Sequence, residues 1–422
     1  MNEKSILIIS SNPMSNVFNN GKTLNAFFDK YPKDKIAQLY FAATLPDSDI
    51  CSTYFRISDV DMLNLKLKRS QKCGEKVEAI EGTNVQTKEE NTVRSVKKNN
   101  FTRLLREALW CSGWDTKELR LWLDEFRPEI VFFLAGDVVY AHKICRYIVT
   151  KYHTKMAMYI TDDYILPRKN PDIFGFIRRR LIKKWMKKSV QSCDALFTIS
   201  EPMRVCYKEM FGKDSFVAAN MYEPDERENK AEGTNENIII TYAGGLHYNR
   251  HLTIMKIVAA IKKINEKNIG KKIILKIYSG SVLKQKDMEE FSKSDCCIWG
   301  GLLDSEALEK ELKQSDFLLH VESFKKSNIC DTKLSLSTKI PEYMSYHKPI
   351  IAIGPKEVAS MKYLEDCACC VTDLKDILPK LEKSLYDDKL TKKLADEAYN
   401  KYLARHDKKK IQPEIMRIID AM

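Results

Sequence analysis

Paired glycines followed by an arginine, in the second half of the sequence, have the types and spacing of a diphosphate-binding loop. Gly244 and Gly245 come directly after an apolar run at 237–243, and Arg250 lies near the expected start of the next helix. Glycines let a ligand approach the backbone, and a helix N-terminus and a guanidinium both attract phosphate. An ordinary strand–turn–helix connection would explain the same glycines, so the pattern alone leaves both interpretations open.

A second string combines helix-capping residues with a cation and a carboxylate. Residues 336–344 read LSTKIPEYM. Ser337 or Thr338 can cap a helix there. Lys339 can meet a phosphate, and Glu342 can accept hydrogen bonds from sugar hydroxyls. Capping alone accounts for part of the string but not for all of it.

Carboxylates follow two expected strands in the first half of the chain. Asp162 and Asp163 come after one of them, directly before Tyr164, and Asp137 follows the preceding one. Ligands of open α/β sheets bind at the carboxyl ends of strands. These residues are therefore candidates for contact with the substrate, with a loop turn or a helix cap as the alternative for each aspartate.

The segment around Gly21 looks like the end of a phosphate-binding P-loop. That motif needs a glycine five residues before Gly21, and Asn16 stands there instead. Without it the loop cannot form the usual anion nest. The remaining interpretation is a turn at 19–21, including Asn20, that lets the backbone approach a ligand at the N-terminus of the next helix.

Short apolar runs, separated by amphipathic stretches of helical length, predict the elements that position these residues. Continuous apolar runs are typical of strands covered on both faces, and their alternation with helices predicts parallel sheets built from βαβ units. Two such series predict an α/β protein with two Rossmann-like domains. The expected strands are 5–10, 36–41, 129–134, 156–161 and 195–200, and then 237–243, 273–278, 296–299, 316–320 and 349–353.

Polar stretches suggest where the domains begin and end. A charged segment at 222–236 contains proline and glycine and reads as a linker, and a polar segment at 66–100 reads as a flexible loop. Pro413 is expected to break the C-terminal helix. The predicted parts are an N-terminal domain at 1–221, a C-terminal domain at 237–400, and a helix at 401–422 that crosses back to the N-terminal domain.

Composition predicts a globular protein with an affinity for anions. The chain has 422 residues, 44% of them hydrophobic, and a formal net charge of +12. Its 12 cysteines form no zinc-binding spacing and are expected to be reduced thiols in or near a core, which suits the cytoplasm. The first apolar run is too short for a signal peptide, and no run is long enough for a membrane span.

The string STKIPEYM, continued by HKPIIAIGP, resembles the donor-site signature of retaining GT-B glycosyltransferases of the family-four type. The resemblance implies the GT-B fold, in which the parallel sheets of two Rossmann-like domains face each other across a cleft. It also implies a nucleoside-diphosphate sugar as donor, with Glu342 holding the ribose. The segment Ala243-Gly244-Gly245, followed by Arg250, resembles the family's diphosphate loop.

Several positions depart from the family pattern or compensate for a departure. Gly245 and Arg250 stand where the family has an arginine and a lysine, and Lys339 is the candidate to replace the missing cation. The usual glutamate eight residues before Glu342 is replaced by Leu334, so Glu322 is the expected partner. Two further assignments come from the resemblance: the loop containing Leu302 reads the base, and Asp162 or Asp163 replaces a histidine that touches the transferred sugar.

A strongly basic helix is expected at 174–190. Its apolar residues 177, 181, 182, 185 and 186 are expected to share one face, with basic residues over the rest, which is typical of an interfacial helix on an anionic membrane. A helix packed on the core with a solvated basic face is the alternative, and no nucleic-acid recognition motif is present. The membrane candidates are Arg178, Arg179, Arg180, Lys183, Lys184, Trp185, Lys187 and Lys188.

These observations predict a glycosyltransferase that moves a sugar from a nucleoside-diphosphate sugar to a lipid-linked or polysaccharide acceptor in cell-surface glycan synthesis. The resemblance implies retention of configuration, and we expect no cofactor, no metal and no nucleic-acid partner. The expected location is cytoplasmic, on the inner face of the cytoplasmic membrane. The alternatives are another GT-B enzyme, such as a nucleotide-sugar epimerase, and a non-catalytic protein that binds membrane or nucleic acid.

Overall fold

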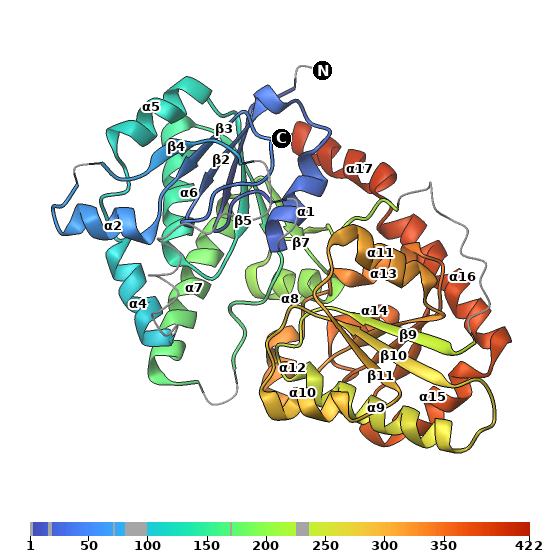
Figure 1. Cartoon of the computed structure of the whole chain (residues 1–422). Helices are drawn as coiled ribbons and strands as arrows, with labels where there is room; N and C mark the ends of the chain where they lie inside the picture. The colour runs from blue at the N-terminus through green and yellow to red at the C-terminus, as the bar shows by residue number, and fades with distance from the viewer. Residues whose placement is uncertain (1–2, 16–18, 71, 81–98, 169–170, 225–235) are drawn as a thin grey trace. The chain divides into compact units, whose positions relative to one another are not determined.

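The chain divides into two compact units, each built around one β-sheet (Figure 1). The computed structural model describes residues 3–15, 19–70, 72–80, 99–168, 171–224 and 236–422. Unit 1 comprises Met1–Ala218 and Gln412–Met422, and unit 2 comprises Ala219–Ile411.

The sheet of unit 1 has eight strands in the order β4-β3-β2-β1-β5-β6-β7-β8, and all its pairs are parallel except β3 with β4. Its central strands consist of apolar residues buried on both faces, as parallel pairing under helices requires. The strands are β1 (Ile6–Ser10), β2 (Ile36–Tyr40), β3 (Thr53–Arg56), β4 (Glu75–Val77), β5 (Ile130–Ala135), β6 (Lys155–Ile160), β7 (Ala195–Thr198) and β8 (Phe216–Val217).

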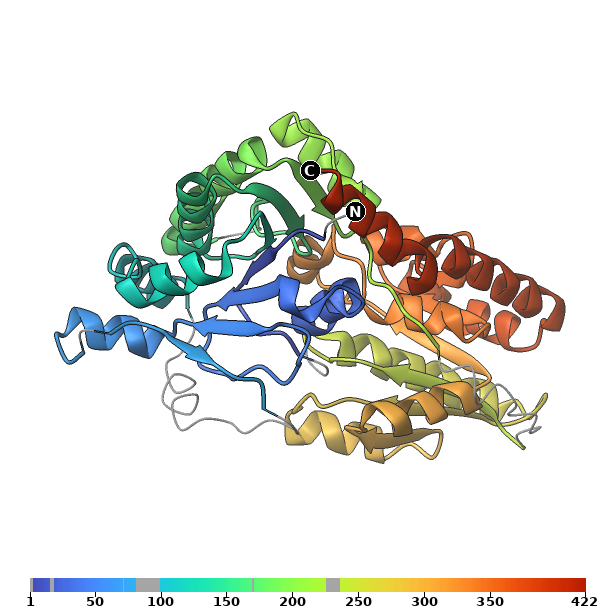
Figure 2. The ribbon, with the colours of Figure 1, turned by 90° about the horizontal axis from the view of Figure 1, so that it is seen from above.

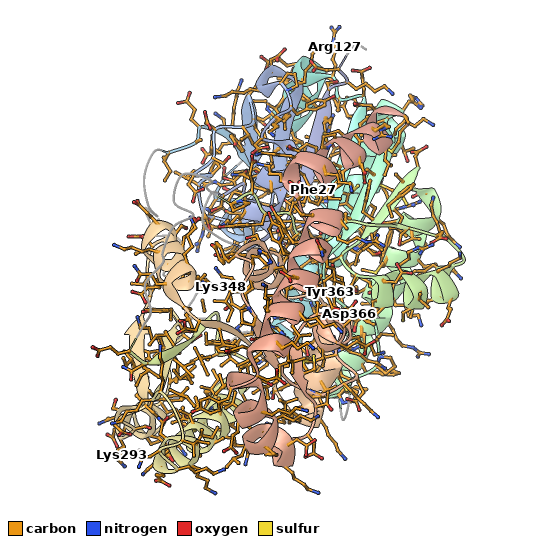
Figure 3. All side chains as sticks on the ribbon, turned by 90° about the vertical axis from the view of Figure 1, so that its right-hand side faces the viewer. Phe27, Arg127, Lys293, Lys348, Tyr363 and Asp366 are labelled. Carbon is orange, nitrogen blue, oxygen red and sulfur yellow. The ribbon has the colours of Figure 1, made fainter. Side chains whose placement is uncertain are left out.

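Helices flank this sheet (Figure 2), and the largest fully buried side chains of the unit are aromatic. Phe27, labelled in Figure 3, packs against Tyr159 with ring centroids 5.3 Å apart. The C-terminal helix joins this unit, since Gln412 Nε2 donates to the Phe27 carbonyl oxygen at 3.1 Å. The helices are α1 (Asn19–Phe28), η1 (Lys33–Lys35), α2 (Asp59–Lys66), α4 (Asn100–Leu109), α5 (Lys117–Phe126), α6 (Val139–Tyr152), α7 (Ile173–Ser192), α8 (Glu201–Phe211) and α17 (Lys408–Asp420).

The sheet of unit 2 has six parallel strands in the order β11-β10-β9-β12-β13-β14. Strand order reverses between β9 and β12, so the carboxyl ends of these two strands form the switch point at which open α/β sheets bind ligands. The strands are β9 (Ile238–Ala243), β10 (Ile273–Tyr278), β11 (Cys297–Gly301), β12 (Phe317–Val321), β13 (Ile350–Ile353) and β14 (Cys369–Val371). The helices are α9 (Arg250–Glu266), α10 (Gln285–Ser292), α11 (Ser305–Gln314), α12 (Lys326–Thr332), α13 (Lys339–Ser345), α14 (Ala359–Leu364), η3 (Leu374–Asp376), α15 (Ile377–Leu385) and α16 (Asp388–Arg405).

The first residues of unit 2 are tied to the end of α16. Tyr222 forms a parallel bridge with Asp407, and the buried His406 ring bonds both the Asn220 carbonyl oxygen at 2.8 Å and the Tyr363 hydroxyl at 2.7 Å. Figure 3 shows Tyr363 and Asp366 beside α16. The chain segment that enters unit 2 is therefore anchored by a buried, uncharged histidine.

Every strand expected from the sequence is present, with similar bounds, but two local expectations are wrong. Residues 75–77, expected to lie in a loop, form β4 because their backbone pairs with the edge of β3, and residues 81–98 of that segment lie outside the described chain. Pro413 does not break the C-terminal helix but lies inside α17. Proline has no N–H to donate to the carbonyl oxygen four residues earlier, which here belongs to the exposed residue Lys409, so it costs the helix one hydrogen bond without ending it.

Candidate functional site

The candidate site in unit 2 lies at the carboxyl ends of three neighbouring strands. Gly244 follows β9, Glu322 follows β12 and Gly354 follows β13. A Cβ atom on Gly354 would lie 2.7 Å from the Cβ atom of Glu322, so only glycine lets the end of β13 come this close. The strand ends are therefore packed against each other around the Glu322 side chain.

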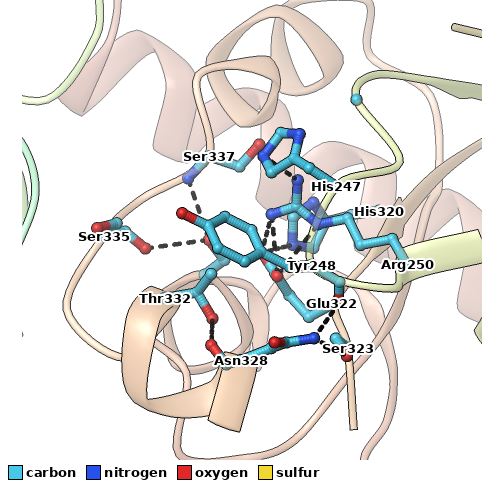
Figure 4. Close-up of polar contacts among 12 residues, drawn as sticks. His247, Tyr248, Arg250, His320, Glu322, Ser323, Asn328, Thr332, Ser335 and Ser337 are labelled. Carbon is cyan, nitrogen blue, oxygen red and sulfur yellow. Dashed lines mark hydrogen bonds and ion pairs between the residues drawn. The ribbon is translucent and has the colours of Figure 1, made fainter. Parts of the chain in front are cut away.

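A buried ion pair between Arg250 and Glu322 spans the switch point (Figure 4). Arg250 Nη2 lies 3.0 Å and 3.1 Å from the two carboxylate oxygens, and Nε lies 3.3 Å from Oε2. The side chains are 14% and 2% exposed. A fork-like contact of this kind fixes the plane of the guanidinium as well as its position.

His320 completes this pair and was given no role by the sequence analysis. Its Nε2 lies 3.4 Å from Glu322 Oε1. Burial by itself would raise the pKa of Glu322, but the neighbouring His320 ring and the charge of Arg250 outweigh it and hold that pKa below its usual value. Glu322 directly follows β12 and stands two residues after His320, so their side chains leave the chain on the same face, and this spacing was the available signal.

Helix α9 begins at Arg250 after two residues with left-handed backbone. Tyr248 and Asn249 both have φ near 60°, and the side chain of Asn249, the residue before the helix, makes no capping bond. The turn is braced from α12, because Asn328 donates both to the Tyr248 carbonyl oxygen and, at 3.1 Å, to Ser323 Oγ. An uncapped helix N-terminus with an arginine as its first residue suits an anionic ligand.

The string at 336–344 forms α13, whose two charged site residues pair with each other. Lys339 Nζ lies 2.6 Å from Glu342 Oε2, and both groups are partly buried. The expected side-chain cap is absent: the residue before the helix, Thr338, has helical backbone angles and makes no capping bond, since Ser337 is instead held through its N–H by Ser360 Oγ. The sequence suggested a cap because serine and threonine are common there, but tertiary contacts hold this turn.

Tyr343 attaches α13 to the end of β9. Its hydroxyl accepts from the Ala243 N–H at 2.9 Å and donates to the Ala243 carbonyl oxygen at 3.1 Å. Pairing of β9 with β12 ends at Thr241, where the two strands diverge. Beyond that point the Tyr343 hydroxyl, rather than a neighbouring strand, bonds the backbone of β9. Glu342, next in sequence, is thereby fixed relative to the loop that carries Gly244. Nothing in the sequence marked Tyr343, because its partner is backbone.

The loop after β11 exposes Leu302, which was expected to face the base of the nucleotide. Leu302 is 78% exposed, and a Cβ atom on Gly280 would lie 3.2 Å from one of its methyl groups. Gly280 follows β10, so Leu302 lies over the end of the neighbouring strand. On the loop after β9, Gly245 is close to the His247 ring, which a Cβ atom at Gly245 would approach to 2.5 Å.

In unit 1 the two adjacent aspartates differ sharply in environment. The buried Asp163 carboxylate accepts from the Ile165 and Leu166 N–H groups, both at 3.0 Å, and pairs with Arg168 Nη1 at 2.6 Å. The Asp162 side chain is exposed, with the Tyr164 hydroxyl 3.4 Å away. Asp163 therefore shapes the loop after β6, while Asp162 is the exposed carboxylate of the two.

Three other predicted residues of unit 1 lie in positions that the sequence did not specify. Asp137, after β5, holds two arginines, Arg103 Nη1 at 2.8 Å and Arg178. Gly21 is not in a turn before a helix but in the first turn of α1, where a Cβ atom would lie 2.6 Å from the Ser15 nitrogen. The close approach that Gly21 allows is therefore made by another segment of the same chain and not by a ligand. Asn20 also belongs to α1, and its side chain lies outside the described structure.

The basic helix is α7, and its cations point in two directions. Arg178 donates to the Asp137 carbonyl oxygen at 2.6 Å, and Arg179 to the Leu166 carbonyl oxygen at 3.0 Å. Trp185 is half-buried, with Lys188 Nζ 4.5 Å from its ring centroid. The five apolar residues expected on one face are split, since residues 182 and 186 are buried and residues 177 and 181 are exposed. The exposed cations are Arg180, Lys183, Lys184, Lys187 and Lys188.

Three further properties concern metals, cysteines and membrane spans. Within the described residues no group of three or more His, Cys, Asp or Glu side chains is placed to hold a metal ion. All 12 cysteines are free, and burial raises the pKa of several, to about 12 for Cys51. None of the helices in the described part of the chain combines the length and apolar character needed to cross a bilayer.

The structure thus brings together Arg250 with Glu322, Lys339 with Glu342, and Asp162 with Tyr164. It gives Asp163 and Asp137 structural partners within unit 1. Glu322 and Glu342, which the resemblance implies are the two glutamates of the donor site, each form an ion pair with a cation.

Solved structures share this fold over nearly the whole chain. Anabaena HepE in complex with UDP has 12% identity and a TM-score of 0.62, covering 99% of this chain and 100% of that one. The α,α-trehalose 6-phosphate synthase from Burkholderia multivorans has 11% identity and a TM-score of 0.62, covering 99% and 97%. A glycosyltransferase from Rickettsia africae has 12% identity and a TM-score of 0.59, covering 99% and 98%.

These similarities show that the chain has the GT-B fold, with two parallel-sheet domains, as the sequence predicted. No protein-family model matches the sequence, and a search of curated proteins finds no relative. At these identities the likeness concerns the fold, and the chemistry has to be argued from the site.

Proposed function

We propose that this protein is a glycosyltransferase that takes its sugar from a nucleoside-diphosphate sugar. The observation that carries the proposal is the Arg250–Glu322 pair, held at the switch point of unit 2 beside the uncapped N-terminus of α9. A guanidinium and a helix dipole at one strand end suit the diphosphate of such a donor. Two solved structures of this fold, those of Anabaena HepE, contain UDP and UDP-glucose.

In this proposal Arg250 and the first turn of α9 stabilise the negative charge that grows on the departing diphosphate. Glu322 acts mainly by fixing the guanidinium plane, because its carboxylate is buried and already bonded to Arg250. Gly244 and Gly245 admit the phosphates, Glu342 holds the ribose next to Lys339, and Leu302 lies against the base. This stabilisation requires no metal or cofactor.

On unit 1 we propose that Asp162, rather than Asp163, contacts the substrate, since only its carboxylate is exposed. The acceptor is a lipid-linked or polysaccharide glycan, and the transfer retains configuration, as the sequence resemblance implies. An enzyme of this kind consumes the donor only when an acceptor is present. A nucleotide-sugar epimerase, the alternative, would convert the donor alone.

Donor binding tests the proposal. A thermal-shift panel of UDP-, GDP- and CMP-sugars should identify one nucleotide that stabilises the protein, and calorimetry then gives its dissociation constant. At 100 times that constant the ligand stabilises the folded protein by about 2.7 kcal/mol. Arg250→Ala should weaken binding by about 10- to 100-fold, because a hydrogen bond to a charged group contributes about 1.5–3 kcal/mol.

A matched control lies on the same helix. Lys267, at the far end of α9, forms an exposed pair with Glu382, and Lys267→Ala should leave the dissociation constant unchanged. Both variants must be measured well below their unfolding temperatures, since Arg250 also contributes to stability. The assignment of the site is wrong if Arg250→Ala binds the donor as tightly as Lys267→Ala does.

A further inference from the structure

Two helices of unit 1 together expose a cluster of large apolar side chains. On α4 these are Phe101 and Leu105, the latter 54% exposed. At the start of α7 they include Ile173, 63% exposed, and Ile177. Single exposed apolar residues are ordinary, but contiguous ones on neighbouring elements mark interaction sites. We call Phe101, Leu105, Ile173, Phe174, Phe176 and Ile177 the α4–α7 patch.

The N-terminal ends of the two helices are fixed to one another, so the patch is one surface (Figure 1). Asn100 Nδ2 donates to Asp172 Oδ2 at 2.6 Å, and the rings of Phe101 and Phe174 pack with centroids 5.1 Å apart. Gly175 is buried between them, and a Cβ atom there would lie 2.7 Å from Asn100 Nδ2. The close approach of the helices at Gly175 keeps the aromatic side chains together on the outside.

Cations continue the exposed side of α7 directly beyond the patch. Helix α7 contains seven basic residues and no acidic one. Two of them, Arg178 and Arg179, are bonded to unit 1 itself. The guanidinium of Arg180 lies 5.0 Å from the ring centroid of Phe176 and so joins the patch to the basic surface. That surface consists of Arg180, Lys183, Lys184, Lys187 and Lys188, all exposed.

We propose that the α4–α7 patch and this basic surface form a docking site for an anionic lipid bilayer. Bulky apolar side chains at one end and a row of cations along the same exposed side match a bilayer, whose acyl boundary lies beneath its anionic headgroups. A protein partner fits less well, because lysine is depleted in protein interfaces. The surface differs from the predicted one in excluding Arg178, Arg179 and Trp185 and in including α4.

Docking in this way brings the carboxyl edge of the unit 1 sheet close to the membrane. Arg178 follows Ile177 in sequence and reaches Asp137 after β5, and Arg103 reaches the same aspartate from between Phe101 and Leu105. If the proposed glycosyl transfer is correct, its acceptor is then an amphipathic lipid. The membrane contact itself does not depend on that function.

Vesicle sedimentation tests the docking site. The full-length protein should bind vesicles of phosphatidylcholine and phosphatidylglycerol, bind phosphatidylcholine vesicles at least ten-fold more weakly, and lose affinity as salt rises. Because each cation contributes about five-fold to partitioning, Lys183→Gln/Lys184→Gln/Lys187→Gln should weaken binding by about 100-fold. Ile173→Ser/Phe176→Ser/Ile177→Ser should weaken it by at least about ten-fold.

Matched controls separate docking from general charge and from catalysis. Lys256→Gln/Lys262→Gln/Lys263→Gln removes three exposed cations from α9, and Leu121→Ser/Val205→Ser removes two exposed apolar side chains elsewhere on unit 1. Both should bind vesicles like the unsubstituted protein. Arg250→Ala should also bind normally, so failure of the proposed donor site would not be mistaken for failure of docking.

Two outcomes would overturn the docking proposal. In the first, both patch variants sediment with anionic vesicles as the unsubstituted protein does, which would leave the patch as a solvated surface. In the second, the apolar variant changes a dimer into a monomer by light scattering without changing vesicle binding, which would assign the patch to a second copy of the chain. Hydrogen exchange of α4 and α7 peptides confirms that each variant is folded.

Discussion

Replacing Glu322 by glutamine should destabilise unit 2 far more than removing an exposed carboxylate of the same unit. The substitution keeps the size of the side chain but leaves the Arg250 guanidinium, 14% exposed, without its counter-charge. It also removes the charged partner of His320, 3.4 Å away. The perturbation is therefore electrostatic, with little change in packing.

The magnitude follows from burial. Removing one partner of a buried ion pair costs about 3–5 kcal/mol, because the remaining charge stays away from water without compensation. The pair between Lys267 and Glu382 is far more exposed, and Glu382→Gln should cost at most about 1 kcal/mol. A double variant, Arg250→Met/Glu322→Leu, should cost less than the sum of its two single changes by more than about 1 kcal/mol, since it leaves no buried charge.

Hydrogen exchange measures the loss of stability within unit 2 alone. A single unfolding midpoint would not be well defined for a protein of two units. Peptides covering β9 and β12 should exchange about 100- to 4,000-fold faster in Glu322→Gln, since 1.4 kcal/mol corresponds to about ten-fold. The difference in exchange between Glu322→Gln and the unsubstituted protein should shrink in acid. The folded-state pKa of Glu322 is depressed, so the stabilisation by its carboxylate is present above the unfolded-state pKa of about 4.3 and is lost as the pH falls below that value. A cost below about 1 kcal/mol at pH 7, equal to that of Glu382→Gln, would refute the reasoning.

Two further predictions concern buried polar groups. Burial lowers the pKa of His142 in unit 1 and of His406 in unit 2 to about 4, so each unit should lose stability on the order of 3 kcal/mol as pH falls from about 6.5 to 4, where the unfolded chain takes up a proton and the folded one does not. In hydrogen-exchange rates corrected for their intrinsic pH dependence, His406→Gln should reduce the acid-induced loss of stability in β12 peptides and leave it unchanged in β5 peptides. An equal loss in both sets of peptides of this variant would contradict the prediction. Tyr343→Phe should destabilise unit 2 by about 1–3 kcal/mol, because the Ala243 N–H and carbonyl lose their partner, and unchanged exchange in β9 would show that another group replaces the hydroxyl.

Residue type alone was sufficient to predict the central strands. Runs such as SILIIS and NIIITYA are apolar at successive positions, and only a strand covered on both faces buries such a run. Edge strands carry a weaker signal: β4 reads EKV and is exposed, so its strand conformation depends on pairing with β3. The same holds for β8, which has two residues and pairs with β7.

The site residues divide in the same way, into those that the local sequence predicts and those that it does not. Gly244, Arg250 and Glu342 were identified from local spacing, because strand ends and helix starts are set within a few residues. The partner of Arg250 was not, since Glu322 is 72 residues away and only the neighbouring positions of β9 and β12 bring them together. Asp162 and Asp163 look alike in the sequence, and the surrounding loop decides that one is buried and the other exposed.

The sequence by itself determined the two α/β domains, the positions of their strands and the strongly basic character of α7, because these depend on residue type and short-range periodicity. Only the tertiary structure decided which charges are neutralised inside the protein and which face outward, as Arg178 and Arg180 on one helix illustrate. Charge is a property of the residue, whereas its desolvation and pairing depend on elements that are distant in sequence.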